Sequence, residues 1–190
     1  MKVAIHMQDN LPKRKNTRLK NYDYSQEGAY FITICTQGKR PLFGKITVGA
    51  DLVSARVELT AAGQMIERVY AETIAAFSDI ISDKHIVMPN HFHCIVSIQR
   101  ADTRFAPTVA GSNEQTLKSI SSFIQALKSK TTVEYVRGVK EGLFLPFNKR
   151  IWQTRFHDHI IRDEASYLRI WKYIDENPLN WQEDCYFVGE

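Results

Sequence analysis

The chain contains 190 residues, of which 44% are hydrophobic and 24% charged, and its formal net charge at pH 7 is +4. These values are ordinary for one globular domain. Three widely spaced cysteines form no Cys-x-x-Cys pair, so the sequence implies no disulfide framework and no zinc knuckle. The N-terminus has no apolar run long enough for a secretory signal, and no later run could span a bilayer. We therefore expect a cytoplasmic protein that does not enter a membrane.

The N-terminal segment is polar and basic. Residues 11–20 include no acidic residue and five basic ones, Lys13, Arg14, Lys15, Arg18 and Lys20. A basic arm of this kind is typical of contact with nucleic-acid phosphate, although it also fits a solubilising tail. We expect a mobile arm over residues 1–27 and a single domain over residues 28–190, with Lys13, Arg14 and Lys15 as candidate DNA-binding residues.

Hydrophobic periodicity and turn signals predict the remaining elements. Strands are expected over residues 30–36, somewhere within 43–59, over 85–88 and 92–98, and within 151–161. Helices are expected over residues 60–77 with Thr60 as N-cap, over about 116–136, and over 164–176. The last helix should stop at Asn177-Pro178, because proline disfavours helical geometry in the residue before it. The order β-β-α-β-β-α-β-α predicts an α+β fold, with helices packed on an antiparallel sheet.

Two histidines follow the turn at Pro89-Asn90, at the start of an apolar strand. Residues i and i+2 of a strand point to the same face, so His91 and His93 would present their imidazoles side by side. Such a pair is half of a divalent-metal site. The same pattern also fits two polar residues on the wet face of an amphipathic strand.

A second candidate pair is His157-Asp158-His159, which also falls on a predicted strand. It too could hold a metal ion, with an aspartate nearby. The position of His91 and His93 after a β-hairpin signal favours the first pair.

Tyr173 and Asn177 lie four residues apart in the last predicted helix and therefore on nearly the same face. Tyr173 lies off the apolar stripe of that helix. A phenol that reaches a metal-bound phosphate can act as a nucleophile, but its ordinary pKa of about 10 means that it needs help to lose its proton. A half-buried helix tyrosine with no chemical role is the alternative.

Three blocks of the chain, in this order, resemble the motifs of one family. Residues 88–96 resemble the His-hydrophobic-His ("HUH") motif of single-tyrosine transposases, residues 151–162 resemble a second block, and residues 173–178 resemble the block that carries the nucleophile. The subgroup that the chain resembles most is the REP-associated tyrosine transposases. The resemblance spans residues 14–182, and ordered blocks are far more specific than any single motif.

The resemblance implies a ferredoxin-like antiparallel sheet with packed helices, a homodimer, and single-stranded hairpin DNA as the substrate. It implies that His91 and His93 are metal ligands and that Tyr173 is the nucleophile. Asn177 matches the position of a third ligand, which is a glutamine in the better-known branch. The ion implied is Mg²⁺ or Mn²⁺, and two imidazoles suit Mn²⁺ at least as well as Mg²⁺. His159 matches a recurring position, for which we expect a structural or DNA-contact role.

Basic and aromatic residues around the second block are further candidates for DNA contact, because single-stranded DNA grooves combine cations with stacking rings. They are Lys149, Arg150, Trp152, Arg155 and Arg162. For Trp152 alone, a role as an anchor of the core is the favoured alternative.

The sequence therefore predicts a metal-dependent transposase that cleaves and rejoins hairpin or palindromic DNA through a 5′-phosphotyrosine intermediate. Because the energy of the broken bond would be kept in the covalent link, ATP is not needed, and the sequence has no phosphate-cradling glycine loop. Two alternatives stay open. One is a catalytically inactive DNA-binding module of the same fold, and the other is a phosphodiesterase that uses water.

Overall fold

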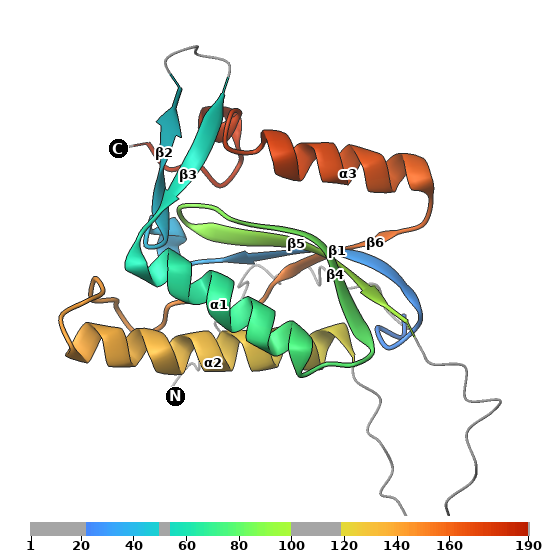
Figure 1. Ribbon diagram of the computed structural model, residues 1–190, viewed down its shortest axis with the longest axis horizontal. Coiled ribbons are helices and arrows are strands. Elements are labelled where there is room, and N and C mark those ends of the chain that lie inside the picture. Colours follow the sequence, from blue (N-terminus) through green and yellow to red (C-terminus); the bar gives the residue numbers. More distant parts are fainter. Residues whose placement is uncertain (1–21, 50–53, 100–118, 190) are drawn as a thin grey trace, which may run out of the picture.

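A computed structural model describes residues 22–49, 54–99 and 119–189 of the chain. Its centre is a four-stranded antiparallel sheet in the order β4-β5-β1-β6 (Figure 1). The strands are β1 (Gly28–Cys35), β4 (Ile80–Val87), β5 (His91–Ile98) and β6 (His157–Ile161). Strands β2 (Gly44–Val48) and β3 (Ala55–Leu59) form a separate β-hairpin that projects from one end of the sheet.

The helices cover the two faces of the sheet unequally. Helices α1 (Ala61–Ala75) and α2 (Ile120–Lys140) pack side by side on one face, and α3 (Glu164–Glu176) lies alone on the other. Apart from the β2–β3 hairpin, the order β1-α1-β4-β5-α2-β6 is the split βαβ arrangement of ferredoxin-like folds. The predicted α+β class and the antiparallel sheet with packed helices are confirmed.

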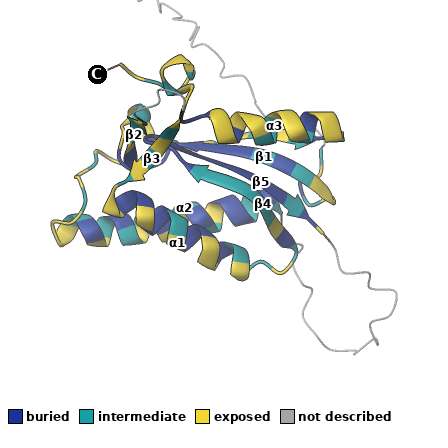
Figure 2. Cartoon of the chain, turned by 45° about the horizontal axis from the view of Figure 1, so that its top comes forward, coloured by how far each residue is buried: buried dark blue, intermediate teal, exposed yellow. Residues whose placement is uncertain are grey.

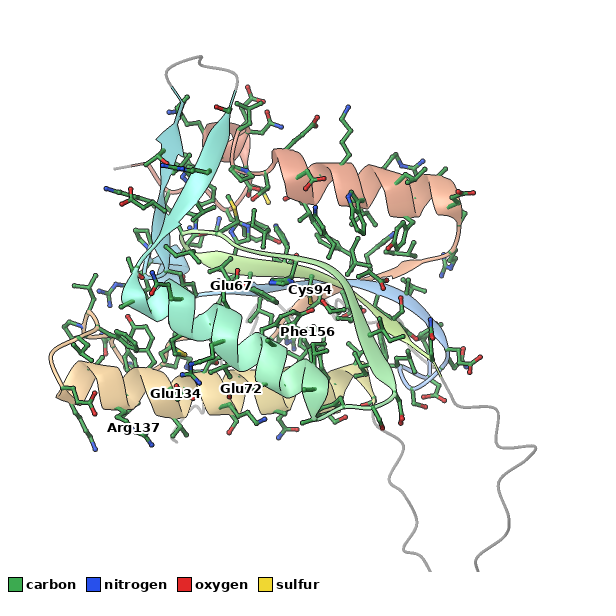
Figure 3. The ribbon with its side chains drawn as sticks, viewed as in Figure 1. Glu67, Glu72, Cys94, Glu134, Arg137 and Phe156 are labelled. Carbon is green, nitrogen blue, oxygen red and sulfur yellow. The ribbon has the colours of Figure 1, made fainter. Side chains whose placement is uncertain are left out.

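The α1/α2 face holds the main hydrophobic core, and both helices turn their buried sides toward the sheet (Figure 2). Tyr70, Phe92 and Phe123 are fully buried there, with ring centroids 4.9 Å apart for Tyr70–Phe92 and 6.1 Å for Tyr70–Phe123. On the solvent side, Arg68 of α1 forms ion pairs with Glu72 and with Glu134 of α2. Figure 3 labels these two glutamates on the neighbouring helices. Burial of the aromatic side chains outweighs these exposed pairs, which contribute at most about 1 kcal/mol each.

Local signals explain where the helices begin. The side chain of Thr60 accepts a hydrogen bond from the backbone N–H of Gly63, as predicted for the N-cap of α1. Ser119 and Ser122 form a reciprocal capping box that starts α2, which ends at Lys140, four residues beyond the predicted end. Helix α3 has the predicted bounds, and Asp163 caps it through the N–H of Ser166.

Three sequence predictions need correction. The strand predicted over residues 85–88 is β4, which begins at Ile80 and ends at Val87. The region 43–59 holds two strands, which pair with each other, rather than one. The packed part of the chain also begins before residue 28, because Tyr24 is buried against Tyr22 and Tyr30. The rest of the predicted arm, including Lys13, Arg14 and Lys15, lies outside the described residues. Within the described ranges, no helix is long and apolar enough to cross a membrane.

We expect Gly63→Ala to destabilise the fold. A Cβ atom at Gly63 would lie 2.1 Å from the backbone oxygen of Phe43, an oxygen that already accepts a hydrogen bond from the Thr60 N–H. Such overpacking costs about 1 to 3 kcal/mol, more than the roughly 1 kcal/mol that alanine gains over glycine in a helix. Urea unfolding measures the difference, with the exposed neighbour Gln64→Ala as the control. An unchanged midpoint for Gly63→Ala would contradict the close approach.

Candidate metal and nucleophile centre

His91 and His93 lie side by side at the start of β5, on the face of the sheet that α3 covers. The side chains are 0% and 1% exposed, and the ring centroids are 4.4 Å apart. The pairing of β5 with β1 places Cys35 opposite His91 and Thr33 opposite His93. The backbone N–H of Met88 donates to the carbonyl of His91 at 2.9 Å and closes the turn that precedes the strand.

Hydrogen bonds to Nδ1 orient both rings. Both N–H groups of the Asn90 amide donate to backbone carbonyls, those of Lys39 and Tyr186, so its Oδ1 is the acceptor for Nδ1 of His91 at 2.9 Å. Nδ1 of His91 therefore carries the proton, and its Nε2 keeps a free lone pair. Nδ1 of His93 pairs with Oγ1 of Thr33, also at 2.9 Å, which leaves its Nε2 directed away from β1.

Both imidazoles are neutral near pH 7. Burial lowers the pKa of His91 to about 4, although the carboxylate of Asp184 acts in the opposite direction. Burial and the neighbouring His91 hold the pKa of His93 well below its ordinary value. Neutral imidazole is the form that binds metal ions.

Tyr173 of α3 reaches the histidine pair from the same chain. Its hydroxyl lies 3.5 Å from Nε2 of His93 and donates to Oδ2 of Asp184 at 3.0 Å, and the side chain is 39% exposed. Its ring also meets the ring of Phe31 edge to face. Burial first, and then the carboxylate of Asp184, raise the pKa of Tyr173, so the phenol is protonated in this arrangement.

Asp184 and Asn177 complete the centre. Ligand atoms of His91, His93 and Asp184 all lie within 4.8 Å of one another. Nε2 of His91 and Oδ1 of Asn177 are buried with no hydrogen-bond partner. Leaving buried polar atoms unpaired costs roughly 1 to 3 kcal/mol each. Two imidazoles, a carboxylate and a lone amide oxygen match the donor preference of Mn²⁺ or Mg²⁺, and a bound ion would satisfy the unpaired atoms.

The segment after α3 folds over this centre. The ring centroid of Tyr186 lies 4.7 Å from that of His91, and that of Trp181 lies 5.8 Å from it. The segment is held by Asn90, which donates to the Tyr186 carbonyl, and by Lys39, whose Nζ donates to the Cys185 carbonyl at 2.7 Å. This cover explains why the two histidines are almost fully buried.

Comparison with known proteins agrees with this architecture. No protein-family model matches the chain. An uncharacterised protein of Haemophilus influenzae is 33% identical over 181 residues, which are 92% of this chain and 93% of that protein. The chain belongs to the same family as this Haemophilus protein. A solved structure of a REP-associated tyrosine transposase bound to a REP hairpin has a TM-score of 0.54 and 20% identity, over 86% of this chain and 74% of that one.

The chain has the fold of that transposase, which confirms the fold that the sequence resemblance implied. A second solved structure, of a candidate transposase from Deinococcus radiodurans, has a TM-score of 0.42 and 15% identity, over 84% of this chain and 95% of that one.

The rival histidine pair lies on the same sheet face as the first pair. β6 pairs with β1 so that His157 is opposite Thr33 and His159 opposite Phe31. Both imidazoles are exposed on an edge strand, and no carboxylate joins them in a candidate metal cluster of the described residues. The carboxylate of Asp184 and the phenol of Tyr173 therefore lie beside His91 and His93, not beside the rival pair. The DNA contact of His159 stays a prediction.

The predicted DNA-contact residues in and around the second block separate by exposure: the four basic residues are exposed and Trp152 is buried. Lys149, Arg150 and Arg162 are exposed. Trp152 is only 5% exposed, packs against Phe43, and donates from Nε1 to Oγ1 of Thr131 at 2.9 Å. Burial of the ring favours the core-anchor alternative, and its predicted DNA contact stays a prediction. Arg155 is exposed at the start of the segment that leads into β6.

Sequence reasoning missed Asp184 and Asn90. Asp184 follows a short 3-10 helix in an irregular segment, so no periodicity links it to the histidines. Asn90 is adjacent to the histidine motif, and its position in the turn was the only signal of its role. Asp184 can be identified as part of the site only from the structure, in which its segment folds back so that Oδ2 accepts a hydrogen bond from Nδ2 of Asn177.

If the centre binds Mn²⁺, we expect His91→Ala and Asp184→Ala each to weaken binding at least about tenfold, because each removes a donor atom of the candidate site. Isothermal titration with MnCl₂ measures this, with circular dichroism to verify folding. His159→Ala is the matched control on the same sheet face. Loss of binding in His159→Ala, with binding retained in His91→Ala, would move the metal site to β6.

We expect Asn90→Ala to weaken Mn²⁺ binding about 10- to 100-fold, although Asn90 is not itself a ligand. Without its Oδ1 acceptor, the His91 ring can rotate, and the proton can move to Nε2. The same titration applies, with the exposed Asn148→Ala as control. Equal affinities for the two variants would show that Asn90 does not orient the ring.

Proposed function

We propose that this protein is a metal-dependent, single-tyrosine DNA transposase that cleaves and rejoins single-stranded hairpin DNA. The observation that carries the proposal is the position of the Tyr173 hydroxyl, between Nε2 of His93 and the carboxylate of Asp184 within one chain. A nucleophile beside a cluster of metal-binding donors is the arrangement that phosphoryl transfer to a side chain requires. The fold shared with a transposase bound to a REP hairpin supports the same substrate class.

A Mg²⁺ or Mn²⁺ ion held by His91, His93, Asp184 and Asn177 would neutralise charge on the scissile phosphate. Oδ2 of Asp184 accepts hydrogen bonds from the phenol and from Nδ2 of Asn177, and Oδ1 accepts one from the backbone N–H of Tyr186. A carboxylate oxygen with one hydrogen bond keeps a second lone pair, so Oδ1 is the oxygen through which Asp184 would bind the ion. The neutral state of both imidazoles leaves lone pairs available at neutral pH. Oδ1 of Asn177 is buried without a hydrogen-bond partner in this arrangement, and the Asn177 side chain is one of the groups that act on His91.

In the proposed cleavage step, Oη of Tyr173 attacks the phosphorus and the bond from phosphorus to the O3′ atom breaks. The phenol proton passes to the Asp184 carboxylate, which already accepts its hydrogen bond. The leaving O3′ takes a proton from water, which gives a 3′-hydroxyl and a 5′-phosphotyrosine. Attack of another 3′-hydroxyl on this linkage reverses the chemistry and rejoins strands without ATP.

The first test uses a library of single-stranded DNA hairpins labelled at the 5′ or the 3′ end, with Mn²⁺ or Mg²⁺, resolved on a denaturing protein gel. We expect an adduct that carries only the label downstream of the cut. It should be absent with EDTA and in Tyr173→Phe. The control is Tyr167→Phe, because Tyr167 is a half-buried tyrosine of the same helix that packs in the small cluster around Ile174.

Other results of this experiment would support one of the alternative functions. Cleaved DNA without an adduct would indicate a water-using phosphodiesterase, and an adduct in Tyr173→Phe would place the nucleophile elsewhere. Binding without cleavage, by a protein that binds Mn²⁺, would indicate the catalytically inactive module. The proposed homodimer is tested separately, by the mass of the protein in solution.

A further inference from the structure

Strand β4 contains a β-bulge next to α3. The register of its pairing with β5 shifts between Ser82 and Lys84, so Asp83 is the extra residue of the bulge. Ser82 faces α1, where its hydroxyl accepts a hydrogen bond from the hydroxyl of Tyr70. Lys84 is opposite Ile95, which belongs to the buried cluster beneath α3. The bulge therefore turns Lys84 toward α3, whereas strict alternation would have placed it on the same face as Ser82.

Lys84 contacts two residues of α3. Its ammonium group forms an ion pair with the carboxylate of Asp175 and lies 4.7 Å from the ring centroid of Trp171. The Lys84 side chain is 24% exposed, so solvent screens its contacts less than those of a fully exposed pair. Trp171 and Asp175 are four residues apart and therefore lie on one flank of the helix, which is the flank that faces β4.

Tyr173 projects from the other flank of α3. Successive residues of a helix are turned by about 100°, so Tyr173 is turned by about 200° from Trp171. Ile174, on the side between the two flanks, is fully buried against the sheet. The Tyr173 hydroxyl meets His93 and Asp184. The helix is thus held by Lys84 on one flank and reaches the metal and nucleophile centre from the other.

Rotation of α3 about its own axis is the motion that would misplace the phenol. Helix side chains reach a radius of roughly 5 to 6 Å, so a rotation of about 10° displaces a side chain by about 1 Å. Misplacement by that distance can lower a reaction rate on the order of 100-fold. Apolar contacts such as those of Ile174 are non-directional, so they oppose rotation less than a contact with a defined ring and carboxylate does.

We propose that Lys84 is a positioning residue for the nucleophile. By contacting Trp171 and Asp175 on one flank, Lys84 fixes the rotation of α3, and with it the place of the Tyr173 hydroxyl on the other flank. The inference rests on the proposed function and adds to it a residue that acts through the helix rather than on the reacting atoms.

The test measures, with Mn²⁺, the rate at which the Tyr173 adduct forms on the hairpin DNA that the wild-type chain cleaves best. We expect Lys84→Met, which keeps an apolar stem but loses the charge, to lower this rate about 10- to 100-fold, because the phenol is displaced. Lys84→Arg should restore it to within about threefold, because a guanidinium can both pair with a carboxylate and stack on a ring. The affinity for Mn²⁺, measured by titration, should be the same in all three proteins.

The matched control is Lys172→Met, the same change at a lysine next to Tyr173 in the sequence. Lys172 also forms an ion pair with an acidic residue of α3, Glu176, but this pair is exposed and lies within the helix. We expect Lys172→Met to react at the wild-type rate, because exposed pairs within one helix contribute little.

Fluorine NMR of the full chain labelled with fluorotyrosine gives a second readout that does not depend on cleavage. The Tyr173 signal is assigned by its loss in Tyr173→Phe. We expect this signal to shift in Lys84→Met and to keep its position in Lys172→Met.

An unshifted Tyr173 signal in Lys84→Met, or equal adduct rates in Lys84→Met and Lys172→Met, would overturn the positioning role. A loss of Mn²⁺ affinity as large as the loss of rate would also overturn it, because the whole centre would then be disturbed. If the wild-type chain forms no adduct, the proposed function fails, and the fluorine signal still decides whether Lys84 positions Tyr173.

Discussion

The register of β5 against β1 is the constraint on which the site depends. It places His93 opposite Thr33 and His91 opposite Cys35, and the carbonyl of Asn90 accepts a hydrogen bond from the N–H of Thr36 at 2.8 Å just beyond the last pair. A slip by one residue would turn both imidazoles into the α1/α2 core, because side chains alternate between the faces of a strand. Phe92, which is fully buried in that core, opposes such a slip, so hydrophobic packing on one face fixes the chemistry on the other.

Periodic signals predicted much of this arrangement. The i, i+2 spacing of His91 and His93 and the position of Tyr173 on the last helix both describe local geometry, and local geometry can be read from sequence. The contacts between β1 and β5, and between α3 and the β5 face, join residues far apart in the sequence. Local patterns do not predict them, so they became known only from the structure. Asp184 illustrates the limit, because it enters the site through a chain reversal that follows no regular element. Trp152 shows the opposite limit, since an aromatic residue among basic ones has the same pattern whether it anchors a core or faces DNA.

The two faces of the sheet differ in how much hydrophobic side chain they bury. The α1/α2 face is an extensive apolar core. Among the described residues, the α3 face has a smaller buried cluster of Ile95, Ile161 and Ile174, with partly buried residues such as Phe31 and Trp171 packed against it. Helix α3 is accordingly bound by few buried apolar contacts, and its exposed outer surface is visible in Figure 2. The residues proposed for chemistry therefore lie on the less stabilised side of the domain, where small displacements cost least.

The hydrogen bonds of Asn90 link the orientation of the His91 ring to the position of the segment that covers it. One amide holds both the ring of His91 and the carbonyl of Tyr186, in the segment that covers the site. Coupling between two sites is reciprocal. If the covered position of the segment raises the affinity of the histidines for an ion by some factor, a bound ion favours the covered position by the same factor. If the centre binds an ion, its occupancy and the position of the covering segment are therefore coupled through Asn90.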